Sequence, residues 1–162
     1  IHAVNPDGSL EWTRSYGGVL AISNDGVIFL ADCYVLFALN PDGSLKWEYR
    51  SHYRFENLAL DADGTVYGGT SEGKILAITA DGVLKWSFTA REGPRSATRG
   101  VPAVVDCDGV IYAGTDFVLY ALNPDGSLKW EFDLERPVHA QAAIDSCGNI
   151  YLDSGQVICP GS

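Results

Sequence analysis

The chain has 162 residues, of which 46% are hydrophobic and 20% charged, a composition typical of a folded globular domain rather than a disordered segment. Its formal net charge of −10 argues against nucleic acid as a partner, because nucleic-acid binding generally needs a basic surface. No apolar run approaches the roughly 18 residues that a membrane-spanning helix needs, so we expect no membrane insertion.

One eight-residue pattern recurs four times along the chain. It reads NPDGSLEW at Asn5–Trp12, NPDGSLKW at Asn40–Trp47, TADGVLKW at Thr79–Trp86 and NPDGSLKW at Asn123–Trp130. The tryptophans that end the four copies lie 35, 39 and 44 residues apart. Repeats of this length are typical of the four-stranded blades of a β-propeller.

A second glycine turn, followed by an aromatic residue, lies between successive copies of the pattern. These segments are Asp25–Phe29, Asp63–Tyr67, Asp108–Tyr112 and, in a degraded form, Cys147–Tyr151. Glycine accepts the positive φ of a tight hairpin turn, so each unit is predicted to be four short antiparallel strands, A to D. In the third unit the predicted strands are Val101–Asp106, Val110–Gly114, Val118–Leu122 and Leu128–Phe132. No helix is predicted, and the fold class is all-β.

The order of the predicted strands bears on how a propeller would close. The chain opens with strands C and D at His2–Asn5 and Leu10–Thr13, and it ends with strands A and B at His139–Asp145 and Asn149–Asp153. With three complete units between them, residues 1–162 form a single β-propeller domain of four blades, one of them split between the two ends. One chain closing a four-bladed ring, two chains forming eight blades, and half of a longer polypeptide all satisfy this count. The segment Gln156–Ser162 has no place in it, because it resembles a shortened second copy of strand C.

The segments VYGGTSEGKILAITADGVLKW (Val66–Trp86) and IYAGTDFVLYALNPDGSLKW (Ile111–Trp130) resemble the repeats of quinoprotein-type, PQQ-like propellers. That family includes dehydrogenases that use pyrroloquinoline quinone, and it also includes the non-enzymatic lipoproteins that help to assemble outer-membrane β-barrels. The chain resembles the lipoproteins more than the dehydrogenases. The resemblance implies eight blades in a ring and a periplasmic or secreted location. It also implies that Trp12, Trp47, Trp86 and Trp130 pack between neighbouring blades.

The enzymes of the family hold a calcium ion, a catalytic aspartate and usually a disulfide between adjacent cysteines, and none of these can be placed on this chain. The segments Asp61–Gly64 and Asp106–Gly109 echo part of a calcium loop but lack its further oxygen ligands. We therefore predict that the chain is not an enzyme and that it uses no cofactor and no metal.

The charged residues are predicted to divide between the two faces of the propeller. In an antiparallel blade the A–B and C–D turns lie on one face, and the B–C turns and D–A links lie on the other. Ten of the fourteen aspartates fall in the first set of turns, and all seven arginines fall in the D–A links. The predicted binding residues are those in the links: Arg14, Tyr16, Arg50, His52, Tyr53, Arg54, Arg91, Arg95, Arg99, Arg136 and His139.

Because the planar guanidinium group matches carboxylate and phosphate groups, the prediction is an interaction or scaffold module whose link face binds an anionic partner. That partner would be an acidic protein segment or an acidic glycan. Solvated loop charges, a carbohydrate-binding propeller and a fragment of a quinone-dependent dehydrogenase are the alternatives.

The four cysteines, Cys33, Cys107, Cys147 and Cys159, form no CxxC motif, which argues against zinc, c-type haem and thioredoxin-like chemistry. They are predicted to be free, partly buried thiols, with a disulfide through Cys159 as the alternative.

Overall fold

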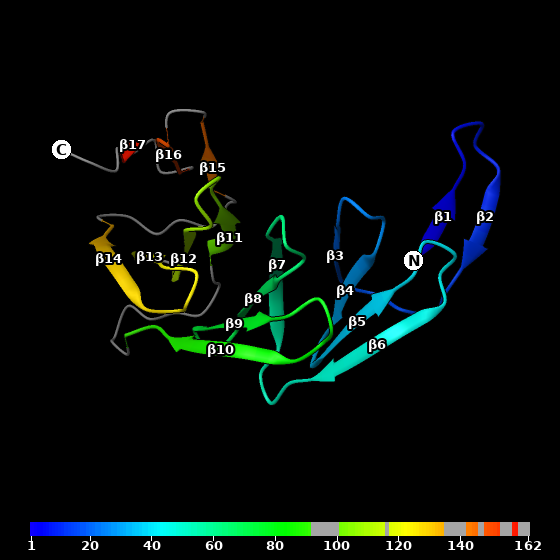
Figure 1. The fold of residues 1–162 in the computed structure, drawn as a ribbon, viewed down its shortest axis with the longest axis horizontal. Coiled ribbons are helices and arrows are strands. Elements are labelled where there is room, and N and C mark those ends of the chain that lie inside the picture. Colours follow the sequence, from blue (N-terminus) through cyan, green and yellow to red (C-terminus); the bar gives the residue numbers. More distant parts are fainter. Residues whose placement is uncertain (92–100, 116, 135–141, 146–147, 153–156, 159–162) are drawn as a thin grey trace.

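In a computed structural model the chain is built of β-strands (Figure 1). The structure describes residues 1–91, 101–115, 117–134, 142–145, 148–152 and 157–158. Within these ranges there is no helix of the length and apolarity needed to cross a membrane.

Three complete four-stranded antiparallel sheets form the middle of the chain. The first sheet contains β3 (Val19–Ile22), β4 (Ile28–Asp32), β5 (Val35–Leu39) and β6 (Leu45–Arg50). The second contains β7 (Phe55–Leu60), β8 (Val66–Thr70), β9 (Lys74–Ile78) and β10 (Leu84–Thr89). The third contains β11 (Val101–Val105), β12 (Ile111–Thr115), β13 (Val118–Leu122) and β14 (Leu128–Asp133). In each sheet the strands pair in chain order, which confirms the predicted A–B–C–D blade and the all-β fold class.

The two ends of the chain form incomplete sheets. Strands β1 (His2–Val4) and β2 (Leu10–Thr13) make a two-stranded sheet, and β15 (Ala143–Ile144), β16 (Ile150–Tyr151) and β17 (Val157–Ile158) make a three-stranded one. Together the sheets form an open arc, with β1–β2 and β15–β17 at opposite ends (Figure 1).

Among the described residues no strand of the first segment pairs with a strand of the last, so closure of the predicted ring is not confirmed. Strand β17 comes from the segment without a predicted place, and it pairs with β16 through Ile150↔Ile158 and Tyr151↔Val157. It thereby occupies the edge of β16 that a split blade would give to β1. Pairing between the first and last segments of the chain stays a prediction.

The hydrophobic core lies between neighbouring sheets in three clusters. The first joins Phe29 and Leu36 to Leu58 and Val66, across the sheets β3–β6 and β7–β10. The second and third repeat this arrangement towards the C-terminus, around Tyr120 and around Leu119. Because the second and third complete sheets pack against a neighbouring sheet on each face, β8 and β13 are buried along their whole length.

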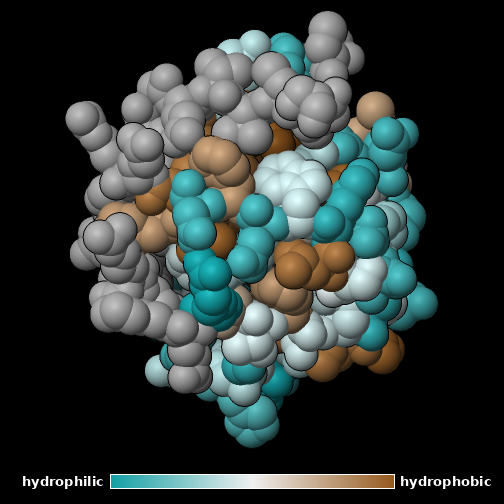
Figure 2. All heavy atoms as spheres, turned by 90° about the vertical axis from the view of Figure 1, so that its left-hand side faces the viewer, coloured by the Kyte–Doolittle hydropathy of each residue, from teal (hydrophilic) through white to brown (hydrophobic). Residues whose placement is uncertain are grey.

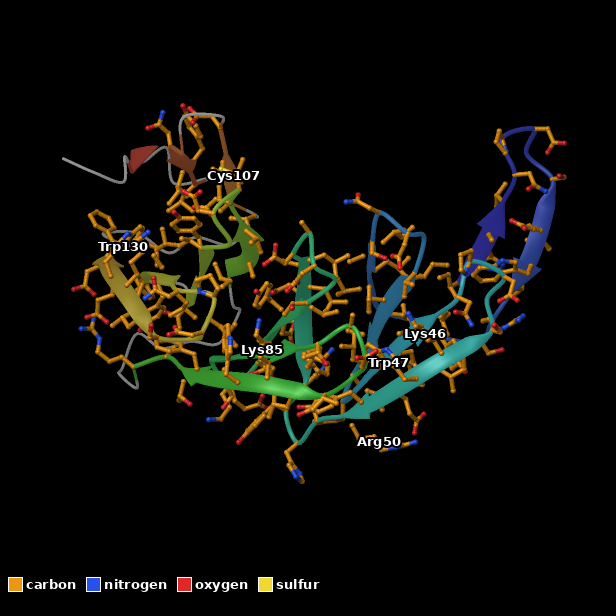
Figure 3. All side chains as sticks on the ribbon, in the orientation of Figure 1. Lys46, Trp47, Arg50, Lys85, Cys107 and Trp130 are labelled. Atoms are coloured by element: carbon orange, nitrogen blue, oxygen red, sulfur yellow. The ribbon has the colours of Figure 1, made fainter. Side chains whose placement is uncertain are left out.

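A tryptophan also ties each sheet to the next. The indole Nε1 of Trp12 donates a hydrogen bond to the Pro41 carbonyl at 3.0 Å, that of Trp47 to Ala80 at 2.8 Å, and that of Trp86 to Pro124 at 3.0 Å. Each acceptor lies in the C–D turn of the following sheet. We call this contact the tryptophan seam, and Figure 3 places Trp47 where β6 meets the neighbouring sheet.

Glycine is required on the other side of each tryptophan seam. A Cβ atom on Gly43, Gly82 or Gly126 would lie 2.9, 2.8 or 2.6 Å from the indole ring of the preceding sheet. The same three glycines have φ between +76° and +86°, which side chains rarely adopt. The Asp-Gly pair of the repeat therefore forms the turn and also leaves room for the indole.

Candidate functional site

The face with the D–A links, which we call the link face, has backbone hydrogen bonds between links and B–C turns in its described part. The link between β6 and β7 is hydrogen-bonded to the B–C turn between β4 and β5: Ser51 N donates to Tyr34 O at 2.8 Å and Phe55 N donates to Cys33 O at 2.8 Å. In the next sheet Ala90 N donates to Gly73 O at 2.9 Å. Side chains in these links are consequently presented from a fixed scaffold, as is common for binding residues.

Three of the four described arginines in the D–A links, Arg50, Arg54 and Arg91, are paired with carboxylates. Arg50 lies 2.9 Å from Glu48, and Arg54 lies 3.4 Å from Glu56. Arg91 contacts Glu131 at 3.1 Å and also pairs with Asp133, whose charge raises the pKa of the guanidinium above its ordinary value. The arginine side chains remain half or more exposed, at 72%, 55% and 51%.

The link between β6 and β7 brings several predicted residues together. Lys74 Nζ lies 5.0 Å from the centre of the Tyr53 ring and donates a hydrogen bond to Thr89 Oγ1 at 2.7 Å. The backbone carbonyl of Arg54 accepts a hydrogen bond from Ser71 N at 2.9 Å, so this link and the β8–β9 turn are held side by side. His52 is exposed in the same link. Lys74 also belongs to this cluster. It was not among the predicted binding residues because it begins strand β9 and does not lie in a D–A link.

Two of the predicted binding residues make contacts within the fold. Arg14 Nε donates a hydrogen bond to the Gly43 carbonyl at 2.8 Å, and its guanidinium lies 5.6 Å from the centre of the Trp12 ring. Arg14 thus lies in the first tryptophan seam, against a C–D turn. Tyr16 stacks on Phe37 with 4.5 Å between ring centres. The remaining predicted residues, Arg95, Arg99, Arg136 and His139, lie outside the described residues.

The opposite face, which we call the turn face, carries the aspartates of the repeat. In the turn Asn40–Ser44, Asp42 Oδ1 accepts hydrogen bonds from the Ser44 hydroxyl at 2.6 Å and from the Ser44 amide at 2.8 Å. The hydroxyl bond is the main cause of a pKa below the ordinary value for Asp42, and the same arrangement lowers the pKa of Asp7 and Asp125. These carboxylates stabilise their own turns.

The structure also shows an open pocket at the turn face that the sequence analysis missed. Its volume is about 410 Å³, and it is lined by three successive A–B turns, with Ser23 and Asn24 from the first, Asp61 from the second and Asp106 from the third. These turns meet because β3, β7 and β11 lie next to one another on the inner side of the arc (Figure 1). The sequence placed the aspartates in turns, but only the packing of the A strands brings them around one pocket.

The aspartates of this pocket are already hydrogen-bonded. Asp106 accepts from the amides of Asp108 and Val110 at 2.9 Å each and from the Tyr112 hydroxyl at 2.9 Å. Asp61 accepts from the Tyr67 hydroxyl at 3.3 Å. Burial, together with these carboxylates, raises the pKa of Tyr67 and Tyr112. Among the described residues no three His, Cys, Asp or Glu side chains are grouped as a metal ion would require.

The cysteines differ in part from the prediction. Cys33 and Cys107 are free, as predicted, but both are exposed rather than partly buried, because each lies in a turn between strands. Cys147 and Cys159 lie outside the described residues. The alternative of a disulfide through Cys159 therefore stays a prediction.

Comparison with known proteins assigns the family. The sequence profile of the family described as "Outer membrane protein assembly factor BamB" matches residues 1–159. The chain belongs to this family. Its repeats are therefore PQQ-like propeller repeats, as the sequence analysis proposed from the residues.

Solved structures with low sequence identity share the fold. BamB from Moraxella catarrhalis superposes with a TM-score of 0.71 at 17% identity, over 93% of this chain and 52% of that structure. A protein of unknown function from Bacteroides caccae gives a TM-score of 0.66 at 15% identity, over 92% of this chain and 61% of that one. The computationally designed Ika8 protein gives 0.70 at 14% identity, over 86% of this chain and 43% of the other.

One curated relative is similar over a short stretch. The uncharacterized protein YxaL of Bacillus subtilis (strain 168) is 43% identical over 56 residues, which are 34% of this chain and 13% of that protein. The chain thus spans about half the length of the solved structures that it resembles and a small part of this relative.

Proposed function

We propose that this chain is a non-enzymatic interaction module that binds an acidic segment of a partner protein on its link face. A protein partner is favoured by the family, whose description names a factor in outer membrane protein assembly. Because the family description refers to the outer membrane, we also place the module outside the cytoplasm, either in the periplasm or secreted.

The observation that carries this proposal is the cluster between β6 and β9. Arg50, Arg54 and Lys74 supply positive charge, and His52 and Tyr53 lie beside them in a link whose backbone is pinned to the B–C turns. A guanidinium group can hold a carboxylate through two parallel hydrogen bonds, and a tyrosine ring gives apolar contact next to it. A short acidic segment fits such a surface.

Pairing with Glu48 and Glu56 does not oppose this role. Exposed ion pairs contribute only about 0–1 kcal/mol to stability, because water screens them. A partner carboxylate can therefore replace Glu48 or Glu56 at small cost, while the link itself stays in place.

The proposal is tested by titrating an oligoglutamate peptide into the chain and measuring the heat of binding at low and at physiological ionic strength. The double variant Arg54→Glu/Lys74→Glu should weaken binding about tenfold or more, because a hydrogen bond to a charged group contributes roughly 1.5–3 kcal/mol. The matched control is Lys46→Glu/Lys85→Glu, which makes the same change in net charge on exposed strand residues near the turn face.

Equal loss of binding in the two double variants would contradict a site on the link face and would indicate a response to net charge alone. Stronger binding of an acidic glycan, such as an oligogalacturonate, than of the peptide would replace the protein partner with a carbohydrate.

A catalytic role is the competing function, through the quinone-dependent dehydrogenases of the wider propeller family. The hydrogen bonds that Asp61 and Asp106 accept from turn amides and tyrosine hydroxyls support a structural role for the carboxylates of the turn face. Absorbance spectra after incubation with pyrroloquinoline quinone and calcium give the decisive measurement. A stable calcium-dependent adduct would overturn the non-enzymatic proposal.

A further inference from the structure

The first complete sheet departs from the repeat pattern where its A strand ends. In the third sheet the A strand is followed by Asp106, whose carboxylate accepts a hydrogen bond from Tyr112 of strand B at 2.9 Å, and the second sheet has the same pair. Counted from the turn glycine, these two positions in the first sheet hold Ser23 and Phe29. The first sheet therefore lacks both the carboxylate and the hydroxyl group of this hydrogen bond.

A second departure lies on the facing side of the same junction, in the C–D turn of the second sheet. The first and third sheets have a proline at the second position of this turn, Pro41 and Pro124, whereas the second sheet has Ala80. The proline ring lies close to the A–B turn of its own sheet, since a Cβ atom on Gly109 would be 3.3 Å from Pro124 Cγ. Alanine has no Cγ or Cδ atom, so these ring carbons are missing from the second sheet.

The side chains at these three positions line a pocket between the first and second complete sheets, which we call the inter-sheet pocket. Its volume is about 290 Å³. One wall is the A–B turn of the first sheet and the other is the A–B turn of the second, and the two turns, β3–β4 and β7–β8, lie on the same side of the arc (Figure 1). Val27 and Phe29, which are buried, form its apolar floor, and Lys46 of β6, next to Trp47, completes the lining (Figure 3).

The equivalent space between the second and third sheets is bridged by a side chain. A Cβ atom on Gly109 of the third sheet would lie 3.7 Å from Oδ2 of Asp61, which belongs to the second sheet. At Gly64, the equivalent glycine of the second sheet, the only described atom within 4 Å of such a Cβ is Ala80 Cβ of its own sheet. Ser23 does not reach across the junction as Asp61 does. The inter-sheet pocket therefore follows from the residues that distinguish this junction and is not a general property of the repeat.

Hydrogen-bonding groups of both kinds surround the apolar floor. Asn24 is exposed, and in the part of the chain that the structure describes no hydrogen bond occupies its side-chain amide. Asp25 and Asp63 lie in the two facing turns. The first accepts a hydrogen bond from the Ser23 hydroxyl and the second from Thr65 N at 2.8 Å, and a carboxylate can accept further ones. A ligand in this pocket meets acceptors from both walls and a free donor.

This separation of apolar and polar groups distinguishes the inter-sheet pocket from the ordinary surface of the molecule. On the side that faces left in Figure 1, hydrophobic and hydrophilic side chains are mixed over the described surface (Figure 2), as is usual for a folded protein. In the inter-sheet pocket the apolar side chains lie at the bottom of a hollow and the polar ones around it. Such an arrangement is typical of small-molecule sites, whose volumes begin at roughly 300 Å³.

The ligand that matches these groups is a neutral ring with several hydroxyl groups. The C–H face of a sugar ring can lie on Val27 and Ala80, while its hydroxyl groups donate to Asp25 and Asp63 and accept from Asn24. An anionic ligand would face two carboxylates, and a wholly apolar one would leave the polar groups without partners. A sugar unit avoids both costs.

The inter-sheet pocket also adjoins the pocket between the three A–B turns. The two share Ser23, Asn24 and Ala62 in their linings. A second sugar unit would there face Asp61 and Asp106. The turn face can thus hold a short chain of sugar units, with one end between the first two complete sheets.

We propose that the inter-sheet pocket binds one unit of a neutral oligosaccharide. Asn24, Asp25 and Asp63 hold its hydroxyl groups, and its apolar face lies on Val27 and Ala80. This site is on the turn face, so it is separate from the link face and does not rest on the binding of an acidic segment there.

The proposal is tested by titration calorimetry with four neutral trisaccharides: maltotriose, cellotriose, mannotriose and chitotriose. We expect at least one of them to bind the wild-type chain. Ser23→Asp/Phe29→Tyr gives the first sheet the residue pair of the other sheets, so it should fold normally and weaken binding about tenfold or more by filling the pocket. Ser87→Asp is the matched control, because it adds the same charge at an exposed position of β10.

A second variant fills the pocket from the other wall. Ala80→Pro restores the proline of the repeat and keeps the carbonyl group that accepts the hydrogen bond from Trp47. It should also weaken binding of the sugar, and it decides the matter if Ser23→Asp/Phe29→Tyr does not fold. Asn24→Ala leaves the pocket open but removes a donor, so it should weaken binding several-fold.

A trisaccharide that binds the wild-type chain and Ser87→Asp, but binds the filled variants weakly, supports the proposal. Failure of all four sugars to bind at millimolar concentration overturns it. Binding that is unchanged in both filled variants also overturns it, because the sugar would then lie elsewhere on the molecule. Tighter binding of trilysine than of every sugar, lost in the same variants, would show that the pocket takes a cationic ligand and not a neutral one.

Discussion

The serine that follows each NPDG turn stabilises the turn through a hydrogen bond to the ionised aspartate. In Asn40–Ser44 the Ser44 hydroxyl donates to Asp42 at 2.6 Å and is the main cause of the lowered pKa of that carboxyl. A carboxyl whose pKa is lower in the folded than in the unfolded chain stabilises the fold above the unfolded value, and it loses this contribution as the pH falls through the folded value. The hydrogen bond therefore matters only while Asp42 is ionised.

We expect Ser44→Ala to lower the thermal stability of the chain slightly at neutral pH. This deficit should shrink as the pH falls below about 3.8, the ordinary pKa of aspartate, and should disappear below the lower pKa that Asp42 has in the folded chain. Thermal unfolding at a series of pH values measures the difference between variant and wild type. Ser87→Ala, an exposed change on β10, is the control and should have little effect at any pH. A Ser44→Ala deficit that is the same at pH 3 and pH 7 would show that the pKa of Asp42 is unrelated to the stability of the turn.

At the scale of the strands and turns, the tryptophan seams couple one sheet to the next. Gly82 has a φ of +81°, and a Cβ atom there would lie 2.8 Å from Trp47 Cδ2. Gly82→Ala therefore combines backbone strain with displacement of the indole, which would lose its 2.8 Å hydrogen bond to Ala80. Gly73→Ala carries similar strain, with φ of +69°, but an ordinary 3.7 Å contact with Ala90.

We expect Gly82→Ala to reduce the free energy of unfolding by about 1–3 kcal/mol more than Gly73→Ala does, which is the usual cost of forcing extra volume into a packed site. Denaturant unfolding gives both values, and the emission of Trp47 should shift to longer wavelength in Gly82→Ala alone. If the two variants lost the same free energy, the turn glycine would be needed for its backbone conformation only.

The strands could be predicted from the sequence because each is bounded by turns with local signals. In the third unit the predicted strands agree with β11–β14 to within one residue, since Asp108–Gly109 and Asn123–Gly126 fix the hairpins on either side. The ion pairs Arg50–Glu48 and Arg54–Glu56 could also have been inferred, because residues two apart in an extended chain share a side.

Features that depend on contacts between distant residues could not be predicted in this way. Arg91 pairs with Glu131 and Asp133, about forty residues further on, only because neighbouring sheets pack together. The pocket between the A–B turns of three sheets arises from the same packing. The place of β17 was missed because its sequence is a degraded copy of a strand that the count had already assigned to the N-terminus.

At the scale of the whole molecule, a repeat architecture makes the stability of each sheet depend on the sheets that pack beside it. Each sheet packs only on the sheets beside it, so the middle of the arc is held on both faces and the two ends on one. Burial follows this order: every residue of β8 is buried, whereas β1 and β2 contain no buried residue. The ends should therefore open locally while the middle stays folded.

Hydrogen exchange on the wild-type chain tests this order of stability. Amides of β8 and β9 exchange mainly through global unfolding, and those of β1 and β2 through local opening at little cost, so we expect the hairpin to exchange at least about a hundredfold faster. Equal protection of the two regions would mean that the hairpin unfolds only together with the central sheets. The cooperative unit would then be the whole arc.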